Sequence, residues 1–216
     1  MLQSLLSLLF PTRCIGCRKY GTALCGACMH SIKLADEIDT HIYAVYDYGN
    51  PLVQHAIWQL KYHRKSELVT ILANRGILFI TEFLGDIFHF TRKEELIFVP
   101  IPGERTRTNN RGFNQSALVA QILKVKIPGA QVSNILHKTR STKAQARVTH
   151  KSAREKNVFH SMGASAQLSK DVIYIVIDDV TTTGATFREA MRALKSAGAK
   201  KVLCIALAHG YARGHK

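Results

Sequence analysis

Two adjacent carboxylates, Asp178 and Asp179, are the side chains in this sequence best suited to chemistry. They end an apolar, β-branched run that starts at Val172, and a turn rich in threonine and glycine follows from Thr181 to Thr186. Backbone N–H groups and hydroxyls at a helix N-terminus form an anion site. Carboxylates do not favour a bare phosphate, so acids beside a phosphate cradle predict a sugar phosphate whose hydroxyls donate to the acids.

The same stretch has a simpler interpretation as an ordinary strand, turn and helix, because Asp and Thr are common in turns and at helix N-caps. That interpretation accounts for Asp179 or Thr181 alone. It does not account for two like charges side by side at a strand end, which repel unless something bridges or solvates them. The ligand-binding interpretation is therefore favoured.

A second group of reactive side chains lies near the N-terminus, where two Cys-x-x-Cys pairs are separated by seven residues. Glycines inside the pairs, Gly16 and Gly26, suit tight turns that direct backbone N–H groups at the sulfurs. Two such knuckles present four thiolates tetrahedrally, which is the geometry of structural zinc. Disulfides or a redox pair are the alternatives, and the short duplicated spacing favours the metal. The predicted zinc ligands are Cys14, Cys17, Cys25 and Cys28.

Basic residues are concentrated in the segment from Gly103 to Asn157, which holds twelve of them against two acids. The whole chain has a net charge of +15. A solvated basic surface normally has acids interspersed, so the segment predicts a polyanionic partner, either a diphosphate or a nucleic acid. The candidate contacts are Arg105, Arg107, Arg111, Arg140, Lys143 and Arg154.

Length and composition predict a globular protein, since 46% of the 216 residues are hydrophobic and only 5 are proline. Met1 to Phe10 is leucine-rich without a preceding basic residue, which favours a short amphipathic helix over a secretory signal. No stretch reads as a membrane span, and we expect a cytoplasmic protein. Residues 1–40 are predicted to form the N-terminal helix, the zinc module and a short helical exit, and residues 41–216 a second domain.

Strands and helices are predicted to alternate along that second domain, which indicates a parallel, doubly wound α/β sheet. The predicted strands are His41–Tyr48, Glu95–Ile101, a weaker Ala130–Leu136, Val172–Ile177 and Val202–Ala208. The predicted helices are Pro51–Arg64, one or two within Ser66–Phe90, Gly112–Leu123 and Ala185–Ala197. Cys204, inside the last strand, is predicted to be a small core residue.

The stretch from Ile173 to Thr186 resembles the 5-phosphoribosyl-1-diphosphate (PRPP) signature of type I phosphoribosyltransferases. Together with the tetracysteine head, further blocks make the whole chain resemble the ComF family of phosphoribosyltransferase-like proteins. These blocks are Tyr46–Gly49, Leu60–Tyr62, Val99–Pro102, Arg111–Gln115, Arg140 with Gln145, and Arg154 with Asn157–Phe159.

The resemblance implies a type I phosphoribosyltransferase-like fold, PRPP as ligand, and a role in DNA uptake during natural transformation. Asp178 and Asp179 would hold the ribose hydroxyls, directly or through Mg²⁺ and its waters. The implied PRPP-binding residues are Asp178, Asp179, Thr181, Thr182, Thr183, Gly184, Ala185 and Thr186. Implied partners are single-stranded DNA and competence proteins such as a helicase or a DNA-processing protein.

Two functional hypotheses remain open. One is a PRPP-binding protein that handles single-stranded DNA. The other is a catalytic phosphoribosyltransferase with an unidentified acceptor, whose catalytic residues the sequence does not assign. Purine salvage relatives carry an additional Asp base where this chain has Thr182. Tyr62 and Phe113, each beside an arginine, are candidate stacking residues for DNA, although isolated aromatics are more often core residues.

Overall fold

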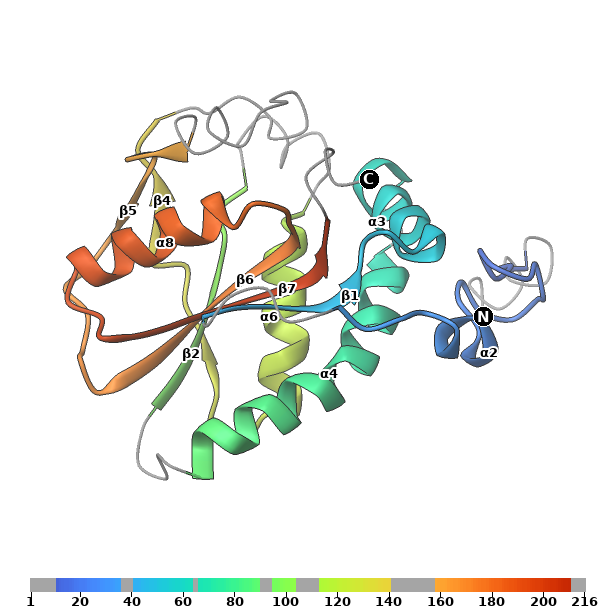
Figure 1. Cartoon of the computed structure of the whole chain (residues 1–216), viewed down its shortest axis with the longest axis horizontal. Helices are drawn as coiled ribbons and strands as arrows, with labels where there is room; N and C mark the ends of the chain where they lie inside the picture. Colours follow the sequence, from blue (N-terminus) through green and yellow to red (C-terminus); the bar gives the residue numbers. More distant parts are fainter. Residues whose placement is uncertain are drawn as a thin grey trace, which may run out of the picture.

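The computed structural model describes residues 11–35, 41–63, 66–89, 95–103, 113–140 and 158–210. Its centre is a five-stranded parallel sheet with the order β1-β7-β6-β2-β3 (Figure 1). The strands are β1 (Ile42–Asp47), β2 (Glu95–Pro100), β3 (Gln131–Val132), β6 (Val172–Thr181) and β7 (Lys201–His209). The helices are α2 (Gly26–His30), α3 (Pro51–His63), α4 (Ser66–His89), α6 (Gln115–Lys126) and α8 (Ala185–Ser196). The predicted parallel α/β fold is confirmed.

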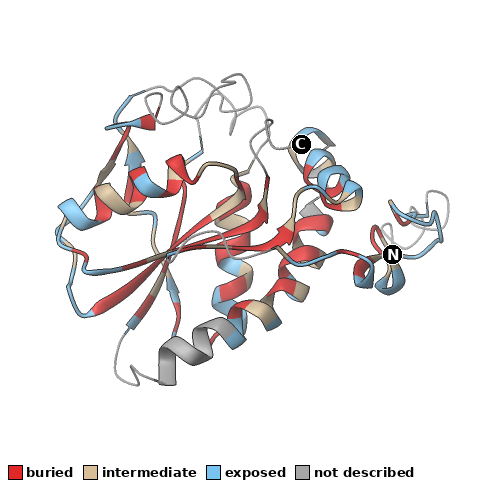
Figure 2. Cartoon of the chain, viewed as in Figure 1, coloured by how far each residue is buried: buried red, intermediate tan, exposed pale blue. Residues whose placement is uncertain are grey.

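The central strand β6 is buried on both faces, which explains its unbroken apolar run (Figure 2). Ile173, Ile175 and Ile177 belong to the core shared with α4 and α6. The alternate residues, such as Tyr174 and Val176, belong to the core shared with α8. Since successive strand side chains point to opposite faces, one run of residues supplies both cores.

The carboxyl edge between β2 and β6 is where the direction of the chain reverses. From β2 the chain passes through α6 to β3 at one edge, and from β6 it passes through α8 to β7 in the other direction. The two helices belong to different cores and therefore cover opposite faces of the sheet. In open α/β sheets, ligands bind outside the carboxyl ends of the strands at this switch point.

Three elements differ from the sequence-based prediction. Strand β6 continues through both acids to Thr181, because it keeps pairing with β7 as far as His209. Helix α6 starts at Gln115, three residues later than predicted, with Asn114 as its N-cap. The predicted strand Ala130–Leu136 is divided between β3 in the main sheet and a separate short strand.

That short strand, β4 (Leu136–Lys138), pairs antiparallel with β5 (Met162–Ala164) in a two-stranded sheet. The partner strand lies far along the chain, so local sequence did not reveal it. The helical exit predicted from Ser31 to Thr40 is not formed in the part of it that the structure describes. Helix α2 ends at His30, residues 31–35 are not helical, and the rest of that segment lies outside the described residues, as does Met1–Phe10. Within the described residues, no helix is both long and apolar enough to cross a membrane.

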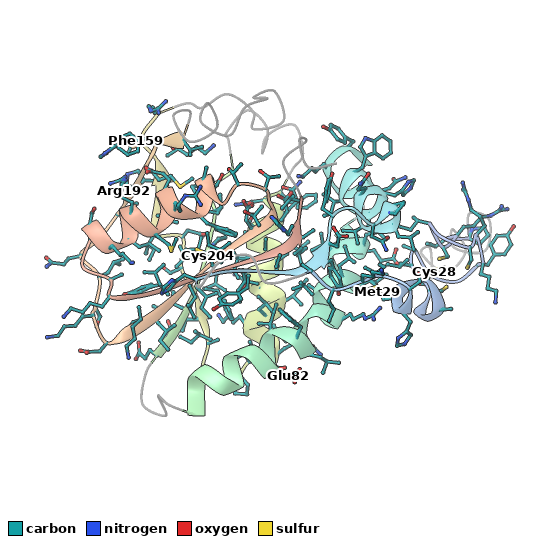
Figure 3. All side chains as sticks on the ribbon, viewed as in Figure 1. Cys28, Met29, Glu82, Phe159, Arg192 and Cys204 are labelled. Carbon is teal, nitrogen blue, oxygen red and sulfur yellow. The ribbon has the colours of Figure 1, made fainter. Side chains whose placement is uncertain are left out.

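A buried carboxylate joins α8 to the two-stranded sheet. Glu189 Oε1 accepts from the Met162 N–H at 3.0 Å, and both of its oxygens accept from Arg192 at 2.8 Å. Arg192, which is labelled in Figure 3, also donates to the Met162 carbonyl at 2.8 Å. Burial raises the pKa of Glu189, but the Arg192 guanidinium and the Met162 N–H outweigh burial and hold that pKa below its ordinary value of 4.5.

We expect Glu189→Gln to lower the free energy of unfolding by about 2 kcal/mol at pH 7, because the paired charge is lost while an amide acceptor remains. The native pKa is depressed, so the charge stabilises the fold above pH 4.5 and stops doing so as the pH falls through the lower native pKa. Urea denaturation should therefore show the variant and the wild type converging below pH 4.5, with exposed Lys195→Gln as control. A pH-independent difference would contradict the pairing.

Candidate functional site

The acid pair lies on the last residues of β6, where the end of α3 reaches it. Lys61 Nζ is 2.8 Å from Asp179 Oδ2, and the two side chains are 25% and 14% exposed. Burial lowers the pKa of the Lys61 ammonium, but the charge of Asp179, reinforced by Asp178, outweighs burial, and the pKa is raised overall. Lys61 therefore remains a cation that balances one of the two carboxylates.

The second carboxylate, Asp178, is held from another helix. The Ser116 hydroxyl at the start of α6 donates to Asp178 Oδ1 at 3.0 Å, and the Asp179 N–H donates to the same oxygen at 2.8 Å. Burial, followed by the charge of Asp179, raises the pKa of Asp178 to about 7. A carboxyl that titrates near neutrality next to one that is ion-paired can both accept and donate hydrogen bonds to ligand hydroxyls.

Asn114 fixes Ser116 in this position. Its side-chain oxygen accepts from the Ser116 N–H at 3.1 Å, and its amide donates to the Ile101 carbonyl at 2.9 Å, just beyond β2. Asn114 therefore ties the start of α6 to the carboxyl end of β2. Sequence analysis did not identify Ser116 as a site residue. The available signal was an Asn N-cap followed two residues later by a hydroxyl.

The turn between β6 and α8 is shorter than predicted, because Thr181 is buried at the end of the strand and its carbonyl accepts from the Gly210 N–H at 2.8 Å. The turn proper is Thr182, Thr183 and Gly184. Gly184 is the N-cap of α8 and has a left-handed backbone conformation, φ 71°. As a glycine it makes no side-chain hydrogen bond to the helix N–H groups. The first-turn N–H groups of α8 are thus oriented as in helix N-terminal anion sites.

Two further contacts shape this turn. A Cβ at Gly184 would lie 2.9 Å from Arg188 Nη1 and 3.0 Å from Ile42 Cδ1, so both the backbone conformation and the space favour glycine. Arg188, one turn into α8, donates to the Thr183 carbonyl at 2.7 Å. A guanidinium therefore lies beside the helix N-terminus, and sequence analysis missed it because it falls after the motif.

The candidate basic contacts are largely outside the described residues, namely Arg105, Arg107, Arg111, Lys143 and Arg154. Arg140 is described: it is exposed at the end of the two-stranded sheet and donates to the Phe159 carbonyl at 2.7 Å. The described residues therefore give no contact between these basic side chains and the acid pair, and the role of the basic side chains remains a prediction.

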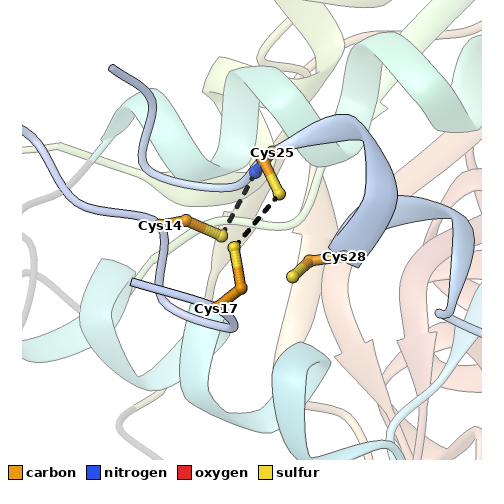
Figure 4. A group of neighbouring side chains, drawn as sticks. All are labelled: Cys14, Cys17, Cys25 and Cys28. Atoms are coloured by element: carbon orange, nitrogen blue, oxygen red, sulfur yellow. Dashed lines mark hydrogen bonds between the residues drawn. The ribbon is translucent and has the colours of Figure 1, made fainter. Parts of the chain in front are cut away.

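The four cysteines come together in one group, as Figure 4 shows. Their sulfurs all lie within 4.8 Å of one another, and Cys17 and Cys25 are 3.6 Å apart. A disulfide needs about 2.05 Å, whereas sulfurs at the corners of a tetrahedron with Zn–S bonds of about 2.3 Å are about 3.8 Å apart. The group can hold a zinc ion.

Backbone groups and a glycine complete the cysteine cluster. Burial raises the pKa of Cys14, but N–H groups from Cys25, Cys17 and Gly16 outweigh it and lower that pKa to about 6. Burial and the neighbouring sulfurs raise the pKa of Cys28 to about 12. A Cβ on Gly16 would lie 2.6 Å from Cys28 Sγ, so only glycine fits the first knuckle.

The second knuckle differs from the prediction. A Cβ on Gly26 would have nothing within 4 Å, and Gly26 begins helix α2 without a left-handed backbone. Gly16 is therefore required by the lack of space for a Cβ and not by a left-handed backbone, and Gly26 shows neither constraint. The fifth cysteine, Cys204, is fully buried in β7, as predicted.

Comparisons with known proteins identify a family and several relatives of this chain. Residues 109–216, half of the chain, match the family model described as a phosphoribosyl transferase domain. The chain is 29% identical over 182 residues to the DNA utilization protein YhgH of Escherichia coli, covering 82% of this chain and 74% of that protein.

Two further similarities are weaker. The chain is 29% identical over 106 residues to competence protein F of Haemophilus influenzae, covering 48% of this chain and 46% of that one. Among solved structures, a purine phosphoribosyltransferase from Pyrococcus horikoshii is similar with a TM-score of 0.33 and 18% identity, over 64% of this chain and 79% of that one.

We expect Lys61→Met to lower the free energy of unfolding by about 1–3 kcal/mol, because two adjacent acids are left without their cation. Asp179→Asn should cost less in the Lys61→Met background than in the wild type, with an interaction energy of about 1–2 kcal/mol in a double-mutant cycle measured by urea denaturation. Exposed Lys126→Met on α6 is the control. Strictly additive effects would show that the ion pair contributes nothing.

Proposed function

Because the chain belongs to the phosphoribosyl transferase domain family and resembles the ComF proteins, we propose that it binds PRPP and acts in the handling of single-stranded DNA during DNA uptake. The observation that carries this proposal is the acid pair at the end of β6, which a short turn joins to the N-terminus of α8. A sugar phosphate presents both hydroxyls and a phosphate. The acids accept hydrogen bonds from the hydroxyls, and the helix N-terminus binds the phosphate.

The residues present also suit the Mg²⁺ that accompanies PRPP in the wider family. Asp178 and Asp179 supply the oxygen ligands that Mg²⁺ prefers, directly or through water. When bound, the ion would offset the charge of the diphosphate. The chain's own residues then orient the sugar. Asp178, held by Ser116, faces the ribose hydroxyls, Thr182 to Thr186 hold the 5-phosphate, and Lys61 limits the negative charge of the acid pair.

A catalytic phosphoribosyltransferase is the alternative form of this proposal. Transfer from PRPP depends on holding the sugar while diphosphate leaves, so positioning and electrostatic support are most of what the protein supplies. The basic residues from Arg105 to Arg154 are candidates for the diphosphate. Thr182 stands where purine salvage relatives carry their base, so the acceptor is not assigned to a purine.

The DNA part of the proposal is supported by the names of the relatives, a DNA utilization protein and a competence protein. The charge of the chain agrees with it, since a net +15 attracts a polyphosphate backbone. We propose that the tetracysteine head binds one Zn²⁺ structurally. A cytoplasmic location and association with other competence proteins are parts of the same proposal.

Replacing both acids, Asp178→Asn with Asp179→Asn, should weaken PRPP binding in the presence of Mg²⁺ by about 2–4 kcal/mol, because two charge-assisted hydrogen bonds are lost. Isothermal titration measures this loss, and inorganic phosphate should bind almost as before, since the helix N–H groups remain. The matched control is Glu82→Gln with Asp171→Asn, two exposed acids elsewhere. Unchanged PRPP affinity in the double variant would refute the assignment, and diphosphate release by the wild type would favour catalysis over binding alone.

Metal analysis should find about one zinc per chain, as one four-coordinate site requires. Cys25→Ser or a strong chelator should remove the metal and lower the melting temperature, because the metal holds the two knuckles of the head together. Cys204→Ser is the control: it places a hydroxyl in the core and lowers stability while the zinc content stays the same. Metal-free protein of undiminished stability would contradict a structural zinc.

A further inference from the structure

Three aromatic rings follow one another along the outer face of α3. His55, Trp58 and Tyr62 are spaced by three and four residues, so they share one side of the helix. The ring centroids are 6.1 Å apart between the first two and 5.8 Å between the last two, with interplanar angles of 50° and 43°. Trp58 is 47% exposed and Tyr62 is 65% exposed. We call these three rings the α3 aromatic ladder.

The packing of α3 does not account for the α3 aromatic ladder. The inner face of the helix is formed by Val53, Ala56 and Ile57, all of them buried at 1% exposure or less. The rings occupy the opposite, solvent-facing side of α3, where the helix needs only polar residues. Single exposed apolar side chains are ordinary on protein surfaces, but a continuous row of large ones marks an interaction surface.

Other exposed rings in the described part of the chain do not form such a row. Tyr20 has the Arg13 guanidinium 4.4 Å from its ring centroid, and Phe159 packs edge-on against His160 with centroids 4.2 Å apart (Figure 3). Each is one ring with one neighbour, whereas the α3 aromatic ladder extends over two helical turns.

The α3 aromatic ladder ends, at Tyr62, close to the acid pair. Lys61 immediately precedes Tyr62 in the chain and contacts Asp179 at the end of β6, so the C-terminal turn of α3 lies at the carboxyl edge of the sheet (Figure 1). The helix contains no acidic residue from Pro51 to His63. Its exposed face therefore offers aromatic surface without negative charge, on a chain of net charge +15.

We propose that the α3 aromatic ladder is a base-stacking surface for single-stranded DNA. This inference rests on the proposed function, and it names the surface that holds the bases. Unpaired bases have free π-faces that stack on aromatic side chains whatever the sequence, while positive charge attracts the backbone. Bases in a duplex already stack on each other, so the ladder selects single strands. A protein partner would bury the same rings, but nothing about the helix favours one, whereas its lack of acids favours a polyanion.

The test uses the fact that Trp58 is the only tryptophan in the chain, so its fluorescence reports this surface alone. Oligothymidylate added to the full-length protein at low ionic strength should quench the emission over the same concentration range that raises the anisotropy of a labelled oligonucleotide. Duplex DNA at equal concentration should not quench it. Added salt should reverse both signals together, since phosphate contacts release counterions.

The variants separate the rings from general charge attraction. Tyr62→Ala and Trp58→Ala should each weaken binding about tenfold by anisotropy, the size expected for one stacked base. Tyr62→Phe keeps the ring and should bind as the wild type does. Leu78→Ala removes an exposed apolar side chain from α4 and should also leave binding unchanged.

The outcomes distinguish this inference from the proposed function. An anisotropy increase without Trp58 quenching, or with full affinity in both alanine variants, would overturn the stacking surface and leave DNA binding intact. If no anisotropy change occurs even at low ionic strength, both the stacking surface and the DNA part of the proposed function are wrong, while PRPP binding is judged by its own titration. Quenching with a loss of affinity confined to the alanine variants would support the inference.

Discussion

Two carboxylates on consecutive residues of the central strand are the constraint on which the rest of the site depends. Burial and the charge of Asp179 both oppose ionisation of Asp178, which raises the pKa of Asp178. The chain relieves the repulsion between the two acids with a cation from α3, a hydroxyl from α6 and a raised pKa for Asp178. Three elements distant in sequence must therefore meet at one edge of the sheet. An arrangement that costs stability and serves no packing purpose is typical of a ligand site.

Much of the fold could be predicted from the sequence because β6 and β7 are buried on both faces, and such strands leave long apolar runs. The acid pair, the glycine turn and the cysteine spacing could be predicted for a different reason, because each lies within one short segment of the sequence. Gly16 was correctly identified as constrained, since its neighbour Cys28 belongs to the same short segment.

What the sequence did not reveal depends on contacts between distant segments. Nothing near Lys61 indicates that it meets Asp179, and nothing near Ser116 indicates that it donates to Asp178. The sequence predicts too early an end for β6 because Asp is depleted in strands, whereas pairing with β7 extends the strand to Thr181. Strand β4 was merged with β3 because its partner, β5, is supplied from another part of the chain.

Helix α3 connects the features that sequence analysis treated separately. At the start of the helix, Leu52 packs close to the first cysteine knuckle. A Cβ on Gly16 would lie 3.2 Å from a methyl group of Leu52. Along its length the helix carries the α3 aromatic ladder, and at its end Lys61 holds Asp179. The cysteine head contributes Cys14, among others, to the same core as the inner face of α3. Because one rigid helix spans all three, loss of order in the head would displace the rings and the cation together. The head is therefore better understood as the support that fixes α3 against the sheet than as an independent appendage.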